Sequence, residues 1–162
     1  MKQSIKVLQD LIWQLECIKY PRMPKEYIPK PTYSDATANG LTKCIIHFVK
    51  ANGYQAERIS NTGRYIDNSK IVTDSMGFQK RIGSGQYIKG TGTNGTADIS
   101  AIIKTIKGTV IPWKIEVKIG KDRQSEAQKK YQKDIENVGG IYTIVKDFDE
   151  FIHQYTWIIE NK

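Results

Sequence analysis

The sequence predicts an α/β domain in which helices flank a mixed four-stranded sheet, on three observations. Apolar residues recur with helical periodicity in four segments: residues 4–19, 41–52, 125–138 and those that follow Asp147. Strand-like runs rich in β-branched residues occupy four others: residues 54–60, 97–106, 111–119 and 141–145. A helix separates the last two runs, which predicts a crossover and parallel pairing, whereas a short turn separates the middle two and predicts an antiparallel hairpin.

The first helix carries one apolar stripe, made of Ile5, Leu8, Ile12 and Leu15. It is followed by YPRMPKEYIPKPTYSDATANG, which holds four of the five prolines of the chain. Because proline fixes φ and removes a hydrogen-bond donor, this segment is expected to be an extended connector and the helix before it an appendage. We therefore expect residues 1–35 to form an N-terminal helix and connector, and residues 36–162 to form the main domain.

The second helix, residues 41–52, is expected to bury Ile45, Ile46 and Val49 and to end at Asn52-Gly53. Residues 60–95 give only weak strand signals, near Ile71-Val72 and Tyr87-Ile88. Lys107-Gly108 is expected to lie in the turn between the strands 97–106 and 111–119, and a hairpin around residues 107–110 sets Asp98 opposite Ile119.

The charge of the chain favours an anionic partner. Its 25 basic residues exceed its 17 acidic ones, and the net charge is +8. This balance favours nucleic acid, although a basic solvated surface would give the same numbers. Cys17 and Cys44 lack metal-type spacing, which is typical of a reducing compartment such as the cytoplasm. We expect no membrane association, because no apolar run approaches the about 20 residues that cross a bilayer and no signal peptide is recognised.

Three charged residues stand in or beside the apolar strands, namely Asp98, Glu116 and Lys118. Glu116 and Lys118 are two residues apart and therefore face the same side of their strand, where the hairpin brings Asp98 near. Two converging carboxylates without histidine or cysteine suit Mg²⁺ or Mn²⁺ rather than zinc, and the Val117 carbonyl is a further candidate ligand. Lys118 beside such an ion would stabilise charge on a phosphate, which is typical of metal-assisted phosphodiester hydrolysis. In the alternative interpretation, Asp98 caps a strand and the other two residues are exposed polar positions.

The segments GTADIS, IEVK, SEAQKKYQ and GGIYTIV together resemble the PD-(D/E)xK nuclease superfamily, and most of all its VRR-NUC and Holliday-junction-resolvase-like branches. The resemblance covers residues 41–155 and is strongest over 95–146. It implies a restriction-endonuclease-like core in residues 36–162, with Asp98 and Glu116 as metal ligands and Lys118 as the catalytic lysine. It also implies that Gln128, on the following helix, supports the site.

The chain departs from the family pattern at two positions. Ala97 stands where the family has proline, and the helix LTKCIIHFVKAN lacks the glutamate that the family often supplies there. Glu57 is the nearest acid that could replace this glutamate, from the following strand. Gln132, one turn after Gln128, is a weaker candidate for the supporting role.

Other residues have alternative interpretations. Ser125 and Gln128 also fit a helix capping box, and the two roles of Gln128 are compatible. GTGTNG, residues 90–95, fits a dinucleotide-binding pattern but leads into a strand rather than a helix, so no nucleotide cofactor is expected. Four basic residues are candidates for contacts with DNA phosphates: Arg58, Lys89, Lys121 and Arg123.

The function expected from these observations is a Mg²⁺-dependent endodeoxyribonuclease, with branched or flapped DNA as the substrate class that the resemblance suggests. The resemblance is also compatible with a homodimer and with a bacterial or phage-infected cell as the setting. The alternative is a non-catalytic nucleic-acid-binding module with a nuclease-like fold.

Overall fold

The computed structural model describes residues 2–60, 63–90 and 92–162. The chain forms two compact units, one made of Met1–Ile59 with Gly95–Lys162 and the other of Ser60–Asn94. The structural division therefore lies at other positions than the boundary expected after residue 35. Within the described residues, no helix is long and apolar enough to cross a membrane.

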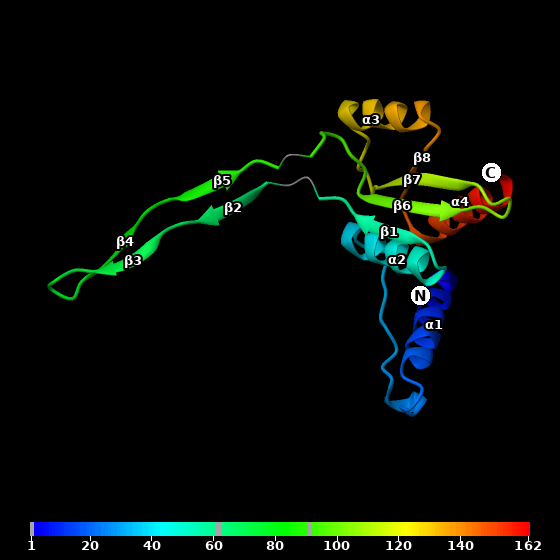
Figure 1. The fold of residues 1–162 in the computed structure, drawn as a ribbon, viewed down its shortest axis with the longest axis horizontal. Coiled ribbons are helices and arrows are strands. Elements are labelled where there is room, and N and C mark those ends of the chain that lie inside the picture. Colours follow the sequence, from blue (N-terminus) through cyan, green and yellow to red (C-terminus); the bar gives the residue numbers. More distant parts are fainter. Residues whose placement is uncertain (1, 61–62, 91) are drawn as a thin grey trace. The chain divides into compact units, whose positions relative to one another are not determined.

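The larger unit is built on a mixed four-stranded sheet with the order β1-β6-β7-β8 (Figure 1). Its strands are β1 (Gln55–Arg58), β6 (Ile99–Lys104), β7 (Val110–Val117) and β8 (Ile141–Val145). β6 pairs antiparallel with β1 and β7, whereas β7 and β8 are parallel. These pairings confirm the α/β fold class, the hairpin and the parallel crossover predicted from the sequence.

Four α-helices and one short 3₁₀ helix complete this unit. They are α1 (Gln3–Lys19), η1 (Lys25–Tyr27), α2 (Ala38–Ala51), α3 (Glu126–Asn137) and α4 (Phe148–Asn161). The main core joins α1, α2 and α4 to one face of the sheet, where Trp113 and Ile115 of β7 are fully buried. Helix α3 lies on the opposite side of the sheet from α2 (Figure 1), and its Tyr131 ring meets Tyr142 of β8 edge-on.

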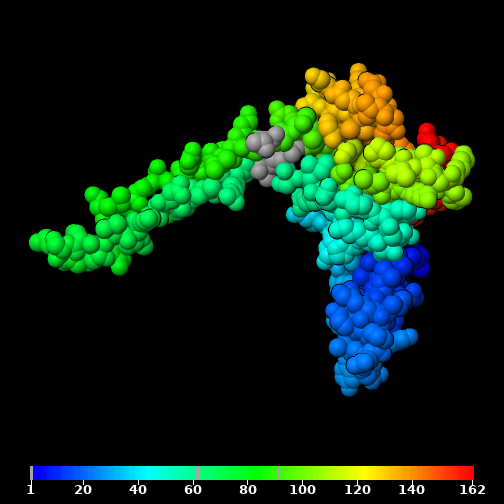
Figure 2. Space-filling view, in the orientation of Figure 1, coloured from blue at the N-terminus to red at the C-terminus, as the bar shows by residue number. Residues whose placement is uncertain are grey.

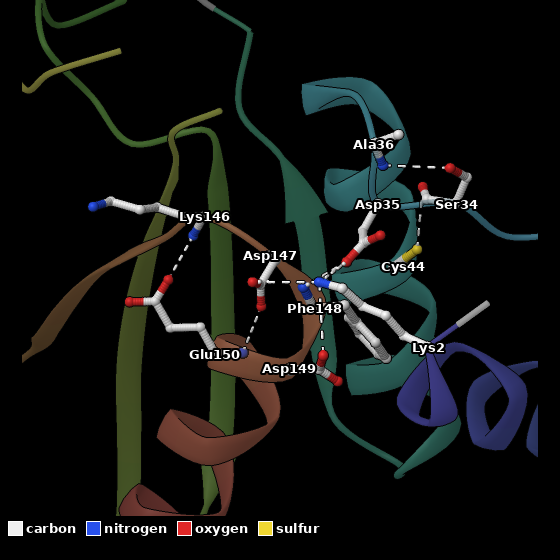
Figure 3. Close-up of polar contacts among 10 residues, drawn as sticks. All are labelled: Lys2, Ser34, Asp35, Ala36, Cys44, Lys146, Asp147, Phe148, Asp149 and Glu150. Carbon is white, nitrogen blue, oxygen red and sulfur yellow. Dashed lines mark hydrogen bonds and ion pairs between the residues drawn. The ribbon is translucent and has the colours of Figure 1, made fainter. Parts of the chain in front are cut away.

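Helix α1 belongs to the core and is not the appendage that its proline-rich connector suggested. Ile5 and Leu8 are buried among the residues of α2 and α4. At the start of the helix, the Lys2 ammonium lies 2.9 Å from a carboxylate oxygen of Asp35, and Asp147 and Asp149 are also within ion-pair distance (Figure 3). Because an apolar stripe needs only one surface to pack on, the extended connector did not prevent α1 from docking.

The β6–β7 hairpin has a different register from the expected one. Ile99 lies opposite Ile115, so continuing the ladder by one pair sets Asp98 opposite Glu116 and not Ile119. The cause is the turn, in which Thr105 and Thr109 enclose a three-residue loop that ends at Gly108 with φ +88°. Three-residue hairpin loops commonly require a residue in this left-handed conformation, which glycine adopts without strain.

The smaller unit, Ser60–Asn94, is a two-stranded antiparallel ribbon in two stretches. β2 (Arg64–Asp67) pairs with β5 (Gly85–Ile88), and β3 (Lys70–Thr73) pairs with β4 (Gln79–Ile82). The weak signals near residues 71–72 and 87–88 fall in β3 and β5, whereas β2 and β4 were not predicted.

Candidate active site

The three predicted charged residues lie on neighbouring strands: Asp98 directly precedes β6, Glu116 lies in β7 and Lys118 directly follows β7. Along β7, Trp113, Ile115 and Val117 face the main core, so Glu116 faces the side of the sheet that α3 occupies. Lys118 follows directly after the strand and continues its pairing, because its N–H donates to the Val145 carbonyl at 2.9 Å. Glu116 is only 2% exposed and Lys118 only 7%, which excludes the alternative that both are exposed polar positions.

Glu116 is held by three side-chain contacts. Its Oε1 accepts from the Lys118 ammonium at 2.9 Å and from the Gln128 amide at 2.5 Å. The Tyr142 hydroxyl donates to Oε2 over a longer distance, 3.4 Å. A buried carboxylate requires such partners, because its desolvation without them costs on the order of several kcal/mol.

Asp98 is half-buried and is fixed through both its side chain and its backbone. Its Oδ2 accepts from the backbone N–H of Val117 at 2.9 Å, and its carbonyl accepts from the N–H of Ile59 at 2.8 Å. The side chain therefore bridges to the residue that follows Glu116. The Asp98 charge is close enough to influence Glu116, whose pKa it raises.

The charges of the site act on one another. Burial raises the pKa of Glu116 above its ordinary value, Asp98 raises it further, and the bond from Lys118 opposes both effects. Burial alone would lower the pKa of Lys118, but its bonds to Glu116 and then to Asp122 raise it, so the amine stays charged. The site thus keeps a buried cation next to two acids, an arrangement that costs stability unless every member is paired.

Gln128 fills both roles that its position suggested. The side-chain Oε1 of Gln128 accepts from the backbone N–H of Ser125 at 2.9 Å, and the backbone N–H of Gln128 donates to the Ser125 hydroxyl. These two bonds complete the capping box of α3. The amide nitrogen of Gln128 at the same time donates to Glu116. Gln132, the weaker candidate, instead contacts Gln124 and Glu136.

The remaining candidates are exposed side chains. Glu57 is exposed and pairs with Ser100 across β1 and β6, and Arg58 is exposed beside it. Lys121 and Arg123 are exposed in the loop between Lys118 and α3. Lys89 belongs to the ribbon unit.

Asp98 and Glu116 are the two carboxylates that are candidate ligands for a divalent metal. Among residues 2–60, 63–90 and 92–162, no group of three His, Cys, Asp or Glu side chains could hold an ion. Mg²⁺, however, keeps several waters and is usually bound by one or two carboxylates together with substrate phosphates. Asp98 and Glu116 supply two carboxylates, the number that this smaller requirement names, and oxygen donors are the type that suits Mg²⁺ or Mn²⁺.

Three residues of the site were not predicted. Tyr142 reaches Glu116 from β8, and Asp122 lies 3.3 Å from the Lys118 ammonium. Gly95, with φ +80°, lies under the first turn of α3, where a Cβ would come within 2.4 Å of the Ala127 carbonyl carbon. The alternation of β8 was a usable signal for Tyr142, because it places this side chain on the face opposite the buried Val145.

No protein-family model matches the sequence, and no curated protein or solved structure is significantly similar to it. The geometry of the site and the resemblance of its motifs are therefore what indicate a function.

Proposed function

We propose that this protein is a metal-dependent DNA endonuclease with a restriction-endonuclease-like core, as in the PD-(D/E)xK superfamily. The observation that carries the proposal is the buried Glu116–Lys118 pair with Asp98 beside it on a rigid sheet. An ion pair buried in this way adds little net stability compared with apolar residues of the same size, so its retention calls for another reason. Catalysis at a phosphate is the reason that fits two acids and one lysine.

Asp98 and Glu116 would hold Mg²⁺ or Mn²⁺, with the Val117 carbonyl as a further candidate ligand. The bound ion would supply Lewis-acid polarisation of the scissile phosphate. Lys118 places its ammonium where it can stabilise negative charge that develops on a phosphate oxygen during attack by water. Gln128 and Tyr142 orient the Glu116 carboxylate, and Asp122 gives the Lys118 amine a second acidic partner.

The net charge of +8 supports DNA as the partner. Arg58, Lys121 and Arg123 are exposed on the unit that carries the site and are available for phosphate contacts, as is Lys89 on the ribbon. Branched or flapped DNA, a homodimer and the cytoplasm of a bacterial or phage-infected cell belong to the proposal through the resemblance alone. No nucleotide cofactor is part of it.

The test is cleavage of a substrate panel by the purified full chain. Linear duplex, single-stranded, flapped and four-way-junction DNA are incubated with Mg²⁺ or Mn²⁺ and, in parallel, with EDTA. Asp98→Asn, Glu116→Gln and Lys118→Met are expected to lose at least about a hundredfold in rate, because each removes charge from the reacting centre. Glu126→Gln is the matched control, since Glu126 is an exposed acid at the start of α3, and it is expected to cut like the wild type. Cleavage that persists in EDTA or in the three variants would refute the proposal.

A non-catalytic nucleic-acid-binding module is the second candidate, and one observation favours it. Among the described residues, no group of three His, Cys, Asp or Glu side chains could hold a metal ion, and the helix LTKCIIHFVKAN lacks the glutamate that the family often supplies from its first core helix. DNA binding without cleavage of any substrate, with either metal, would support this module over the nuclease.

A further inference from the structure

The ribbon Ser60–Asn94 exposes an unusual amount of apolar surface for a unit with so little core. Two-stranded ribbons are at best marginally stable in water on their own, and this one is a thin, elongated body in the space-filling view (Figure 2). Its large exposed apolar residues are Tyr65, Ile71, Val72, Met76, Phe78, Ile82, Tyr87 and Ile88. Continuous exposure of this kind indicates a surface that binds a partner.

The charge of the ribbon indicates the chemistry of that partner. Residues 60–94 contain five basic and two acidic side chains, a net charge of +3. Both acids are used within the ribbon. Asp67 pairs with Arg81 and accepts from the Ser69 N–H, whereas Asp74 accepts from the backbone N–H groups of the tip. Four basic side chains are left without an acidic partner among the described residues of the ribbon: Arg64, Lys70, Lys80 and Lys89.

The register gathers two of these charges on one face. Lys70 lies opposite Ile82 and Val72 lies opposite Lys80, so the two lysines form a diagonal pair on the same face of the β3–β4 ladder. All four side chains are exposed. Apolar groups between two unpaired cations suit the edge of a nucleic acid, where phosphates flank the less polar sugars and bases.

The β2–β5 ladder adds a pair of aromatic rings. Tyr65 lies opposite Tyr87, and both are exposed. A Cβ on Gly85 would collide with the Tyr65 ring, and one on Gly63 would collide with the Tyr87 ring. The hydroxyl end of each ring therefore lies close against the backbone at a glycine, where any larger residue would displace it.

We propose that the Ser60–Asn94 ribbon is a DNA-binding arm that enters a groove of duplex DNA. The major groove is about 12 Å wide and admits a two-stranded β-ribbon. Lys70 and Lys80 contact the phosphates at the edge of the groove, and the apolar residues face the bases and sugars. The inference shares with the proposed function only the requirement that DNA is the ligand, and it does not depend on cleavage.

The experiment measures binding of the full chain to a fluorescein-labelled duplex by anisotropy, in EDTA so that no cleavage occurs, over a series of salt concentrations. Lys70→Gln/Lys80→Gln is compared with Lys6→Gln/Lys25→Gln, which makes the same change of net charge at exposed positions of the other unit. The ribbon variant is expected to bind about tenfold more weakly, and the slope of log affinity against log salt is expected to fall by about 1.8, or about 0.9 for each lost phosphate contact. The control variant is expected to keep the wild-type slope.

A second measurement needs no variant. Limited trypsin digestion of the wild type should cut at Lys70 and Lys80, and bound duplex should protect both positions. Equal affinity of the two double variants, together with unprotected ribbon cleavage, would overturn the proposal. So would equal or tighter binding of single-stranded DNA through the ribbon, since a groove would then not be needed.

Three further outcomes separate this inference from self-association of the ribbon and from the endonuclease proposal. If the ribbon variant changes the oligomeric state in light scattering while its DNA affinity is unchanged, the surface binds a second copy and the proposal is wrong. If the wild type binds DNA through the ribbon but cuts no substrate, the arm is supported and the endonuclease proposal fails. If the wild type cuts DNA but the ribbon variant binds DNA as tightly as the wild type, the endonuclease proposal is supported and the arm proposal fails.

Discussion

Replacing Lys118 with methionine is expected to destabilise the fold far more than the loss of a surface ion pair would. The Lys118 side chain is almost completely buried, and its main partner, Glu116, is more deeply buried still. Methionine has a similar length and fills the space, so the change removes the charge without opening a cavity. The Glu116 carboxylate would then remain buried with only Gln128 and Tyr142 as donors.

The size of the effect follows from this uncompensated charge. Breaking a buried ion pair costs about 3–5 kcal/mol, and the two remaining donors place this case near the lower end, at about 3 kcal/mol. For a chain of this length that corresponds to a fall in Tm of roughly 6–12 °C. The double variant Glu116→Gln/Lys118→Met removes both charges together and is expected to recover to within about 1 kcal/mol of the wild type, because replacing a whole buried pair is often neutral or stabilising.

Urea unfolding in EDTA, followed by tryptophan fluorescence, to which the fully buried Trp113 contributes, measures these free energies. Lys114→Met is the matched control. Lys114 is two residues before Glu116 on the same face of β7 and donates to the Ser100 hydroxyl at 2.6 Å, so its loss leaves no carboxylate without a partner. It is expected to cost about 1 kcal/mol or less, the usual contribution of one hydrogen bond. A Lys118→Met protein as stable as this control, or a double variant no more stable than Lys118→Met, would refute the reasoning.

Two other predictions follow from particular contacts. Burial, and after it the charges of nearby lysines, lowers the pKa of His47 below 6.5, and its Nδ1 lies 2.5 Å from the Tyr33 hydroxyl. The unfolded chain therefore binds a proton at this residue more readily, so the unfolding free energy of the wild type should fall below pH 6.5 more steeply than that of His47→Gln. Parallel pH curves for the two proteins would contradict this prediction. Gly95→Ala should lower the free energy of unfolding in urea by at least about 1 kcal/mol more than Gly53→Ala does. Both residues have positive φ, but only Gly95 lies against the backbone of α3. Equal losses in the two variants would show that the contact with α3 does not matter.

The elements that bury an apolar face were predictable from the sequence. The strand 141–145 has its predicted bounds, and the helix expected over 125–138 spans Glu126–Asn137, since a capping residue at one end and two glycines at the other mark it clearly. The ribbon was only partly predictable, because its strands bury almost nothing and local patterning then carries little signal. Helix α1 was misjudged because the packing of an amphipathic stripe is decided by a distant surface, here α2 and α4.

The three charged residues of the site were identified from strand alternation, from the expected hairpin and from the motif resemblance, but the contacts among them depend on the exact turn, which none of these specifies. The expected register placed Asp98 opposite Ile119, which alternates with Glu116 and faces the other side of the sheet. The observed register differs from it by an odd number of residues and so returns Asp98 to the side of Glu116. This parity is set at the far end of the hairpin, where Gly108 adopts a positive φ and closes a three-residue loop. The geometry on which the proposed chemistry depends is therefore determined by a glycine at the opposite end of the two strands, and a reading of the charged residues by themselves could not have found it.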